Sequence, residues 1–305
     1  MLRLKVSDRP LSGGPEIFRK NFIKEASLRS DISVLKHKNF DCELCFISFR
    51  RTHNKPVFLR LDGCYTDKKR FGMNKSIVSS IRNSNYQIYQ SEFSQNLFKK
   101  MLKVDVSQSS VIHNGVDTSV FTHTDWEEKD ELSFVSCATW RTNKRPNSII
   151  RGFLEADIKD SKLYFIGSGK FNKIKDPRIK YLGDIKNSKV IEYLKRSRYY
   201  VNLSYMESCP NSVIEAISCG CRVLCGNLGG TSEIVNSGDV VCDIDPVFNF
   251  KLQRNILDNI SPSIVAGGIK KLVSSEYKSY SICKNSILPI EKCIDKYIEV
   301  IERIL

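Results

Sequence analysis

Long apolar runs are missing from this sequence, and none approaches the roughly 20 residues that a membrane-spanning helix needs. The first residues, Met1 to Asp8, contain no apolar core of a secretory signal peptide and instead predict a β-strand. Internal repeats and low-complexity tracts are absent as well, which excludes solenoid and fibrous architectures. We therefore expect a globular protein of the cytoplasm.

The cysteines do not form a disulfide framework. There are eleven of them, an odd number, and they are scattered through apolar segments such as Ser218 to Cys225. This pattern is typical of small buried thiols in a reducing compartment. Cys42 and Cys45 have the spacing of a zinc or redox pair, but they lie in a predicted strand and no second pair exists. We expect no metal site.

The net charge of +14 is compatible with several anionic partners. A basic surface attracts phosphates, whether they belong to nucleic acid, anionic lipid or a nucleotide sugar. The charges are dispersed, which favours an ordinary solvated surface, and no nucleic-acid motif occurs, so we expect no nucleic-acid partner. The clusters Lys68-Lys69-Arg70 and Lys99-Lys100 leave open a peripheral contact with an anionic membrane.

Strand-like apolar runs alternate with amphipathic stretches along all 305 residues, which predicts parallel sheets with crossover helices. In the first half, the predicted strands cover 2–6, 32–35, 44–49, 57–61, 87–90 and 110–112, and the predicted helices cover 16–28, 75–84 and 92–101. In the second half, the predicted strands cover 133–137, 162–166, 180–182, 199–203, 222–225 and 240–242, and the predicted helices cover 146–156, 189–197, 210–218, 232–235 and 290–305.

The polar stretch 118–131 lacks periodicity and looks like a linker between two α/β halves. We therefore predict an N-terminal Rossmann-like domain over 1–120, a C-terminal Rossmann-like domain over 121–287, and a final helix over 288–305 that packs back on the first domain. Two doubly wound domains joined in this way imply a central cleft, because ligands bind at the carboxyl ends of parallel strands.

The most informative stretch runs from Glu207 to Gly220. Pro210 suits the start of a helix and Gly220 the position just past its end. The free N–H groups of Asn211 and Ser212 would then form a diphosphate site at the helix N-terminus. Glu207 would lie in the loop before the helix and Glu215 one turn inside it, and each carboxylate can accept hydrogen bonds from paired hydroxyls of a sugar or ribose.

The segment from Glu207 to Gly220, followed by Gly229-Gly230-Thr231-Ser232-Glu233, resembles glycosyltransferase family 4. Further pieces fall in the order of that family: His113-Asn114-Gly115-Val116-Asp117, Trp140-Arg141-Thr142-Asn143-Lys144-Arg145, Ile166-Gly167-Ser168-Gly169 and Leu182-Gly183-Asp184. The first half matches more loosely, mainly through Ser12-Gly13-Gly14-Pro15 and Gln90-Ser91-Glu92. The resemblance implies a GT-B fold and retaining, metal-independent transfer from a nucleotide sugar, with no cofactor besides this co-substrate.

The resemblance also implies roles for individual residues. Arg141 and Lys144 would neutralise the donor diphosphate, Glu207 would contact the transferred sugar, and Glu215 would bind the ribose hydroxyls. The other residues expected at the nucleotide-sugar site are Gly13, Gly14, Gly167, Leu182, Cys209, Pro210, Asn211 and Ser212. Each also has a structural interpretation: the charged residues could be solvated surface groups, and the glycines could serve turns alone.

The sequence departs from the family on the acceptor side. The first half is short, and the loop from Leu59 to Tyr65 lacks the histidine that family members often carry beside the reacting sugar. Asp62 in this loop could receive the acceptor proton or could cap the following turn. Asp243-Ile244-Asp245 resembles the metal-binding motif of the other glycosyltransferase fold, but it follows the last predicted domain strand and we interpret it as a turn.

These patterns together predict a hexosyltransferase that uses a UDP- or GDP-sugar and a hydroxyl acceptor, which could be a glycan, a lipid or a protein. The main alternative is a catalytically weak or inactive nucleotide-sugar-binding protein of the same fold. A sugar-nucleotide epimerase would need its own acid–base pair, which we do not identify in the sequence.

Overall fold

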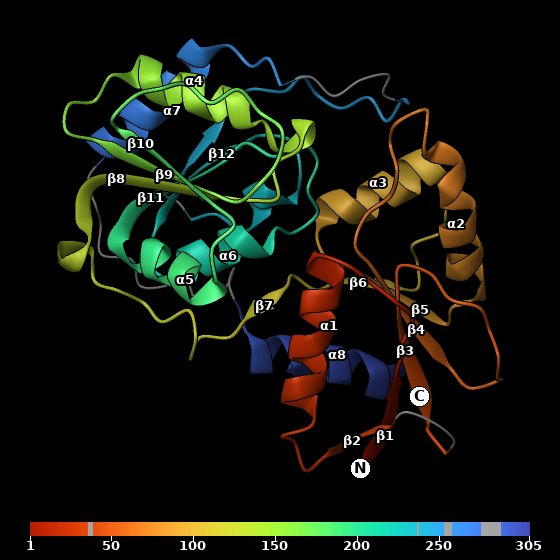
Figure 1. The fold of residues 1–305 in the computed structure, drawn as a ribbon. Helices are drawn as coiled ribbons and strands as arrows, with labels where there is room; N and C mark the ends of the chain where they lie inside the picture. The colour runs from red at the N-terminus through yellow and green to blue at the C-terminus, as the bar shows by residue number, and fades with distance from the viewer. Residues whose placement is uncertain (36–38, 237, 253–257, 276–287) are drawn as a thin grey trace. The chain divides into compact units, whose positions relative to one another are not determined.

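The computed structural model describes residues 1–35, 39–236, 238–252, 258–275 and 288–305 (Figure 1). The chain divides into two compact units. Among the described residues, unit 1 comprises those within 1–117, 249–252 and 288–305, and unit 2 comprises those within 118–248 and 258–275. No helix in these ranges is both long enough and apolar enough to cross a bilayer.

Unit 1 is built on a six-stranded parallel sheet with the strand order β2-β1-β3-β4-β5-β6. The strands are β1 Leu2–Val6, β2 Ile32–Leu35, β3 Cys42–Phe46, β4 Val57–Leu61, β5 Tyr86–Tyr89 and β6 Ser109–Val111. Two further short strands, β7 Gly115–Val116 and β14 Leu288–Pro289, pair with each other in parallel. The central strands β3 and β4 are fully buried, as expected for a sheet covered by helices on both faces.

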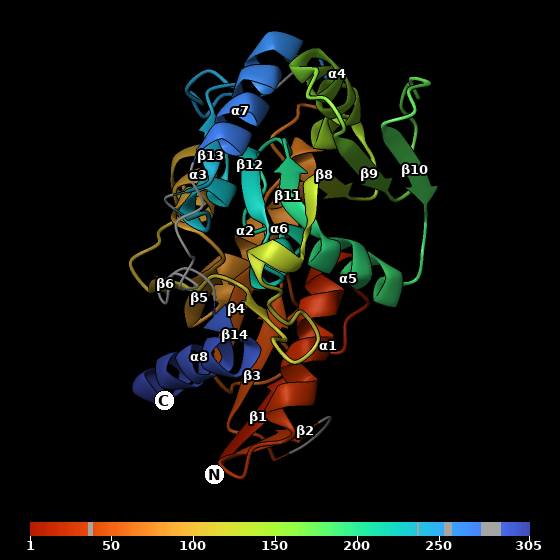
Figure 2. The same cartoon turned by 90° about the vertical axis from the view of Figure 1, so that its left-hand side faces the viewer.

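Helices cover both faces of this sheet. The helices α1 Gly14–Ala26 and α8 Ile290–Ile304 share one apolar core with β1 and β3, in which Phe22 packs edge-on against Tyr297 at 5.5 Å between ring centroids. The helices α2 Asn74–Asn83 and α3 Glu92–Leu102 contribute to a second core with β4 and β5, and the 3₁₀ turn η1 Phe71–Met73 precedes α2. Figure 2 shows the same elements from the side.

Unit 2 contains a second six-stranded parallel sheet with the order β10-β9-β8-β11-β12-β13. The strands are β8 Asp130–Cys137, β9 Lys162–Ile166, β10 Ile179–Gly183, β11 Ser197–Asn202, β12 Arg222–Gly226 and β13 Val240–Cys242. Helices α4 Pro146–Ala156 and α7 Pro262–Ser274 lie on one face, and α5 Asn187–Arg196 and α6 Asn211–Ser218 on the other (Figure 1). Short 3₁₀ turns occur at η2 Trp126–Glu128, η3 Thr142–Lys144 and η4 Gly230–Glu233.

The strand order of unit 2 reads 3-2-1-4-5-6 in chain order, which is the order of the Rossmann fold. Unit 1 has the related order 2-1-3-4-5-6. Both units are therefore doubly wound, and the predicted α/β class with two Rossmann-like halves is confirmed.

Four sequence predictions of local structure need correction. The strand predicted over 44–49 begins at Cys42 and stops at Phe46, because Ile47 has a positive φ of 65°. The helix predicted over 232–235 is the single 3₁₀ turn η4. Helix α7 was not predicted at all. The stretch expected to be a linker is packed on unit 2: the ring of Trp126 meets that of Tyr199 at 5.5 Å.

Candidate active site

The topological switch point of unit 2 lies between β8 and β11, the neighbouring strands whose connections lead to opposite sides of the sheet. The loop after β8 carries Arg141 and Lys144, and the loop after β11 carries Glu207 and leads into α6. Ligands of doubly wound sheets bind in the crevice outside the carboxyl ends of the strands at such a point. The topology therefore brings the sequence-predicted charged residues to one place.

Backbone hydrogen bonds join the loops around this point. The N–H of Tyr205, after β11, donates to the carbonyl of Asn143, after β8, at 2.8 Å. The N–H of Gly230, after β12, donates to the carbonyl of Glu207 at 2.8 Å. Gly229 has φ 130°, and a Cβ there would lie 2.9 Å from the Glu207 carbonyl oxygen. The loop containing Glu207 is thus held from both sides, and the close approach of the backbone at Gly229 leaves no room for a side chain there.

Gly167 joins the loop after β9 to the loop after β8. Its φ is 106°, and a Cβ there would lie 1.9 Å from the carbonyl oxygen of Ala138. Its N–H donates to the carbonyl of Gly183, at the end of β10, at 2.8 Å. Leu182 precedes that glycine and is half-buried. The close approach of the two loops is therefore a sufficient reason for a glycine at position 167. The predicted contacts of Gly167 and Leu182 with the donor stay predictions.

Lys144 and Glu207 form an ion pair between Lys144 Nζ and Glu207 Oε1. Their side chains are 23% and 21% exposed, so the pair is partly desolvated yet open to a ligand. The second carboxylate oxygen, Glu207 Oε2, is buried and makes no hydrogen bond to any described part of the chain. This oxygen retains hydrogen-bonding capacity that a hydroxyl group of a ligand could use.

Arg141 lies on the same loop and is exposed. Its backbone is extended, and the residue immediately precedes the η3 turn that ends at Lys144. Within the ranges that the structure describes, its guanidinium forms no ion pair. A cation that is exposed and free of carboxylates can neutralise a ligand phosphate without first breaking an internal contact.

Arg145 follows Lys144 but has a different environment. Its guanidinium binds Asp245 through two hydrogen bonds of 2.7 and 2.5 Å, and both side chains are 5% exposed. It also lies over the ring of Tyr205 at 5.0 Å. Asp245, in the segment Asp243-Ile244-Asp245, therefore anchors the loop after β8. Sequence reasoning missed this pair, since its partners are far apart in the chain.

The N-terminus of α6 opens between Glu207 and Glu215, as predicted. Pro210 is the N-cap residue, and its side chain provides no capping hydrogen bond. The N–H groups of Val213 and Ile214 donate to the Pro210 carbonyl at 3.1 and 3.3 Å. The preceding N–H group, that of Ser212, has no backbone partner in the described chain, and the positive end of the helix dipole lies here. This helix end is suited to an anion.

Cys209 and Pro210 are buried, whereas Asn211 and Ser212 are half-buried. The hydroxyl of Tyr200, on β11, donates to the carbonyl of Cys137, on β8, at 3.2 Å. This bond ties together the two strands at the switch point.

Glu215 lies one turn inside α6 and is half-buried. Its carboxyl group makes no ion pair or hydrogen bond in the portion of the chain described. Desolvation raises the pKa of this carboxyl to about 7, far above the usual range of a glutamate. A partly desolvated carboxyl without internal partners is destabilising for the free protein, which is typical of groups kept for a ligand.

The predicted site residues of unit 1 are described separately. Gly13 and Gly14 are exposed at the start of α1, and a Cβ at either would meet no atom within 4 Å. They follow β1, which borders β3 at the switch point of this sheet. Their predicted contact with the donor phosphate stays a prediction.

Asp62 belongs to a buried polar network. Its Oδ1 pairs with the fully buried Arg60 and accepts from Gln90 Nε2 at 2.7 Å. Arg60 also donates to Asn114 Oδ1 at 2.8 Å and lies over the ring of Phe18 at 3.9 Å. Burial raises the pKa of the Asp62 carboxyl. Sequence reasoning missed this network, although a charged residue inside the apolar run 57–61 signals a buried partner.

These features define a GT-B protein, with two doubly wound units and a phosphate-suited helix end at the switch point of the second. Residues 131–248, all within unit 2, match the family model described as glycosyl transferases group 1. None of the curated proteins matches the sequence significantly.

Several solved structures have the same fold. HepE from Anabaena, solved in complex with UDP and glucose, superposes with a TM-score of 0.70 at 13% identity, over 99% of this chain and 99% of that one. Sucrose-phosphate synthase from Thermosynechococcus elongatus gives a TM-score of 0.68 at 13% identity, with 99% of each chain covered. A glycosyltransferase from Rickettsia africae gives 0.63 at 13% identity, over 99% of this chain and 98% of that one.

Proposed function

We propose that this chain is a retaining, metal-independent glycosyltransferase that moves a hexose-type sugar from a UDP-sugar to a hydroxyl acceptor. The observation that carries the proposal is the arrangement at the switch point of unit 2. There the Lys144–Glu207 ion pair comes from loops joined to each other, and α6 opens directly after Glu207 with Glu215 one turn inside.

In this proposal the donor binds along the carboxyl ends of β8 and β11. Its diphosphate lies at the N-terminus of α6, near the backbone of Asn211 and Ser212, and is neutralised by Arg141 and Lys144. Glu215 accepts hydrogen bonds from the ribose hydroxyls. The carboxyl has no competing internal partner among the described residues, which supports this role.

Donor binding would rearrange the ion pair. Lys144 exchanges the Glu207 carboxylate for a phosphate oxygen, and the released carboxylate accepts hydrogen bonds from hydroxyls of the transferred sugar. Because both side chains are partly exposed, breaking their ion pair costs little free energy, and neither charge is left buried without a partner.

Charge builds up on the leaving diphosphate as the bond to the sugar breaks. Cationic side chains and helix N–H groups placed at that position stabilise the transition state more than the ground state. In front-face transfer the acceptor attacks from the side of the leaving group, and its proton passes to the leaving phosphate. Asp62, whose Oδ1 is held by Arg60 and Gln90, is then not required as a base.

We propose uracil as the nucleotide base of the donor, because solved neighbours of this fold carry UDP or UDP-glucose, as HepE does. GDP-sugars are the second choice. The acceptor is proposed only as a hydroxyl compound, whether glycan, lipid or protein. A catalytically weak or inactive nucleotide-sugar-binding protein of the same fold is the alternative.

A thermal-shift panel followed by a transfer assay tests this proposal. UDP and UDP-sugars at about 100 times their dissociation constant are expected to add ~2.7 kcal/mol to the free energy of unfolding, with smaller effects from GDP and ADP. Release of UDP from one donor, with retention at the anomeric carbon seen by proton NMR, completes the test. Binding without turnover would favour the alternative, and absence of any nucleotide effect would refute both.

A further inference from the structure

The two helical faces of unit 1 differ in charge. The segment 66–103, which contains η1, α2 and α3, carries eight Lys or Arg residues against two Asp or Glu, a net +6. The helices α1 and α8, which share the other core of this unit, carry six basic and six acidic residues. The segment of α2 and α3 therefore carries +6 of the chain's net charge of +14, whereas α1 and α8 are neutral overall.

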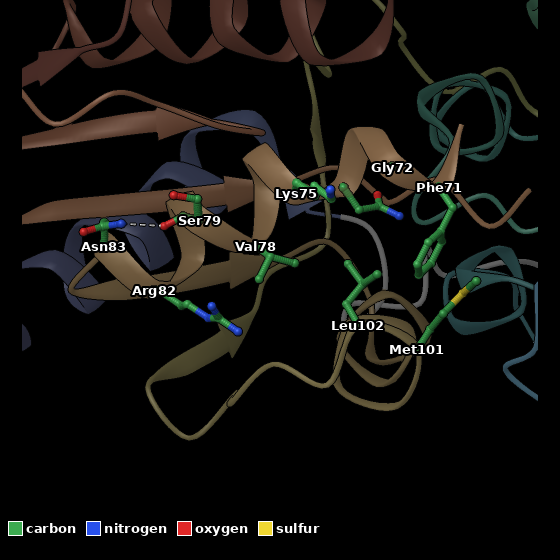
Figure 3. A pocket seen from close by; sticks show the side chains of 10 residues that line it. Phe71, Gly72, Lys75, Val78, Ser79, Arg82, Asn83, Met101 and Leu102 are labelled. Carbon is green, nitrogen blue, oxygen red and sulfur yellow. Dashed lines mark hydrogen bonds between the residues drawn. The ribbon is translucent and has the colours of Figure 1, made fainter. Parts of the chain in front are cut away.

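A cavity of about 690 Å³ opens on this side, lined by residues of η1, α2 and the end of α3 (Figure 3). Its apolar lining comes from Phe71, Val78, Met101 and Leu102. Apolar surface that lines a cavity in this way is available to a hydrocarbon group of a ligand.

Basic side chains border the same cavity. Lys75 and Arg82 line it from α2, are exposed, and form no ion pair with any residue that the structure describes. Lys99 and Lys103 are exposed on and just after α3. Met73, beside the cavity on η1, is 54% exposed. Unpaired cations next to an apolar hollow match a ligand with an anionic head and an aliphatic body.

We infer that the α2–α3 face of unit 1 docks on the surface of an anionic lipid bilayer. Headgroup phosphates would lie between Lys75 and Arg82, and a lipid chain would rest on Val78 and Leu102. The charge complementarity argues for an anionic partner, and the apolar lining argues for lipid over nucleic acid, which has no aliphatic group to fill it. This inference does not depend on the proposed donor chemistry.

Vesicle sedimentation with the full chain tests it. Phosphatidylcholine vesicles with and without phosphatidylglycerol are titrated with wild-type protein and with K75E/R82E. We expect binding only to the anionic vesicles. The double variant should lower the partition coefficient by roughly 30-fold or more, since each basic residue near an anionic surface contributes about fivefold. The matched control K20E/K296E makes the same charge change at exposed positions of α1 and α8 and should remain within about threefold of wild type.

A second variant tests the apolar lining. Leu102→Gln leaves the charge of the protein unchanged and replaces an apolar side chain by a polar one of similar length. It should remove the part of vesicle binding that survives high salt. Circular dichroism melting confirms that each variant is folded. Equal binding to neutral vesicles, or equal losses in K75E/R82E and K20E/K296E, would overturn the inference. So would binding of a single-stranded RNA oligonucleotide or inorganic phosphate that depends on Lys75 and Arg82 without binding to anionic vesicles.

Discussion

Replacing Lys144 by alanine is expected to lower kcat about 10²- to 10³-fold, as loss of one preorganised group facing a developing negative charge does in other enzymes. The cation is held at the switch point of unit 2 by its pairing with Glu207, where the donor phosphates are proposed to lie. Because the pair is partly exposed, the variant should lose only about 1 kcal/mol of stability. Steady-state release of UDP and thermal unfolding measure the two effects.

Lys159→Ala is the matched control, since Lys159 is an exposed lysine of the same unit and precedes β9, away from the carboxyl ends of the strands. Lys144→Arg should recover part of the activity, because it keeps the charge with different geometry. Arg141→Ala should also lower turnover strongly, without a stability cost. If Lys144→Ala turned over donor as fast as the Lys159→Ala control, Lys144 would have no place in the catalytic site.

Replacing Glu215 by glutamine is expected to weaken UDP binding while making the free protein more stable. The folded-state pKa of about 7 lies above the ordinary value of 4.5. The folded protein therefore gains stability from the protonated group at low pH and loses it as the pH rises through about 7. Glutamine removes that loss, so the variant should gain roughly 1–3 kcal/mol over wild type at about pH 8 and little at about pH 5.

The same substitution is expected to raise the stability of the free protein but to lower its affinity for UDP. Loss of a charged acceptor for two ribose hydroxyls should weaken UDP binding about 10- to 100-fold, as measured by calorimetry at about pH 8. For wild type, affinity should rise with pH through about 7, because the carboxylate is the better acceptor. Burial also raises the pKa of Asp239, to about 6, so that carboxyl contributes to the pH dependence of the wild-type protein as well. The difference between Glu215→Gln and wild type therefore isolates the contribution of Glu215.

Glu155→Gln serves as the control for this experiment, since Glu155 is an exposed glutamate on α4. It should change neither the stability difference between the two pH values nor the affinity for UDP. A Glu215→Gln protein that is destabilised, or that binds UDP like wild type, would show that the residue is structural.

The sequence predicted the doubly wound architecture because buried parallel strands leave near-continuous apolar runs, such as 57–61 and 162–166. Helix α7 was not predicted from the sequence because it contains Gly267 and Gly268, and each glycine disfavours a helix by about 1 kcal/mol relative to alanine. Its packing against α4, which joins elements far apart in the chain, compensates for that deficit. Local propensity does not report such packing.

The residues of the candidate site also fall into two groups, those that local sequence places and those that contacts between distant segments place. Glu207, Pro210 and Glu215 lie within one short segment, so spacing and capping preferences alone place them around a helix N-terminus. The Arg145–Asp245 pair and the Arg60–Asp62–Gln90 network arise from contacts between distant segments, and a single sequence does not encode which partners meet. For Asp62 this left the capping and acceptor-side interpretations equally open, whereas the structure places it in the network.

A crystal structure of the chain with UDP would show whether the start of α6 holds the donor diphosphate. We expect the diphosphate at the N–H groups of Asn211 and Ser212, within reach of Arg141 and Lys144, and the ribose hydroxyls on the Glu215 carboxylate. A nucleotide bound anywhere else, or a diphosphate that makes no contact with the start of α6, would contradict it.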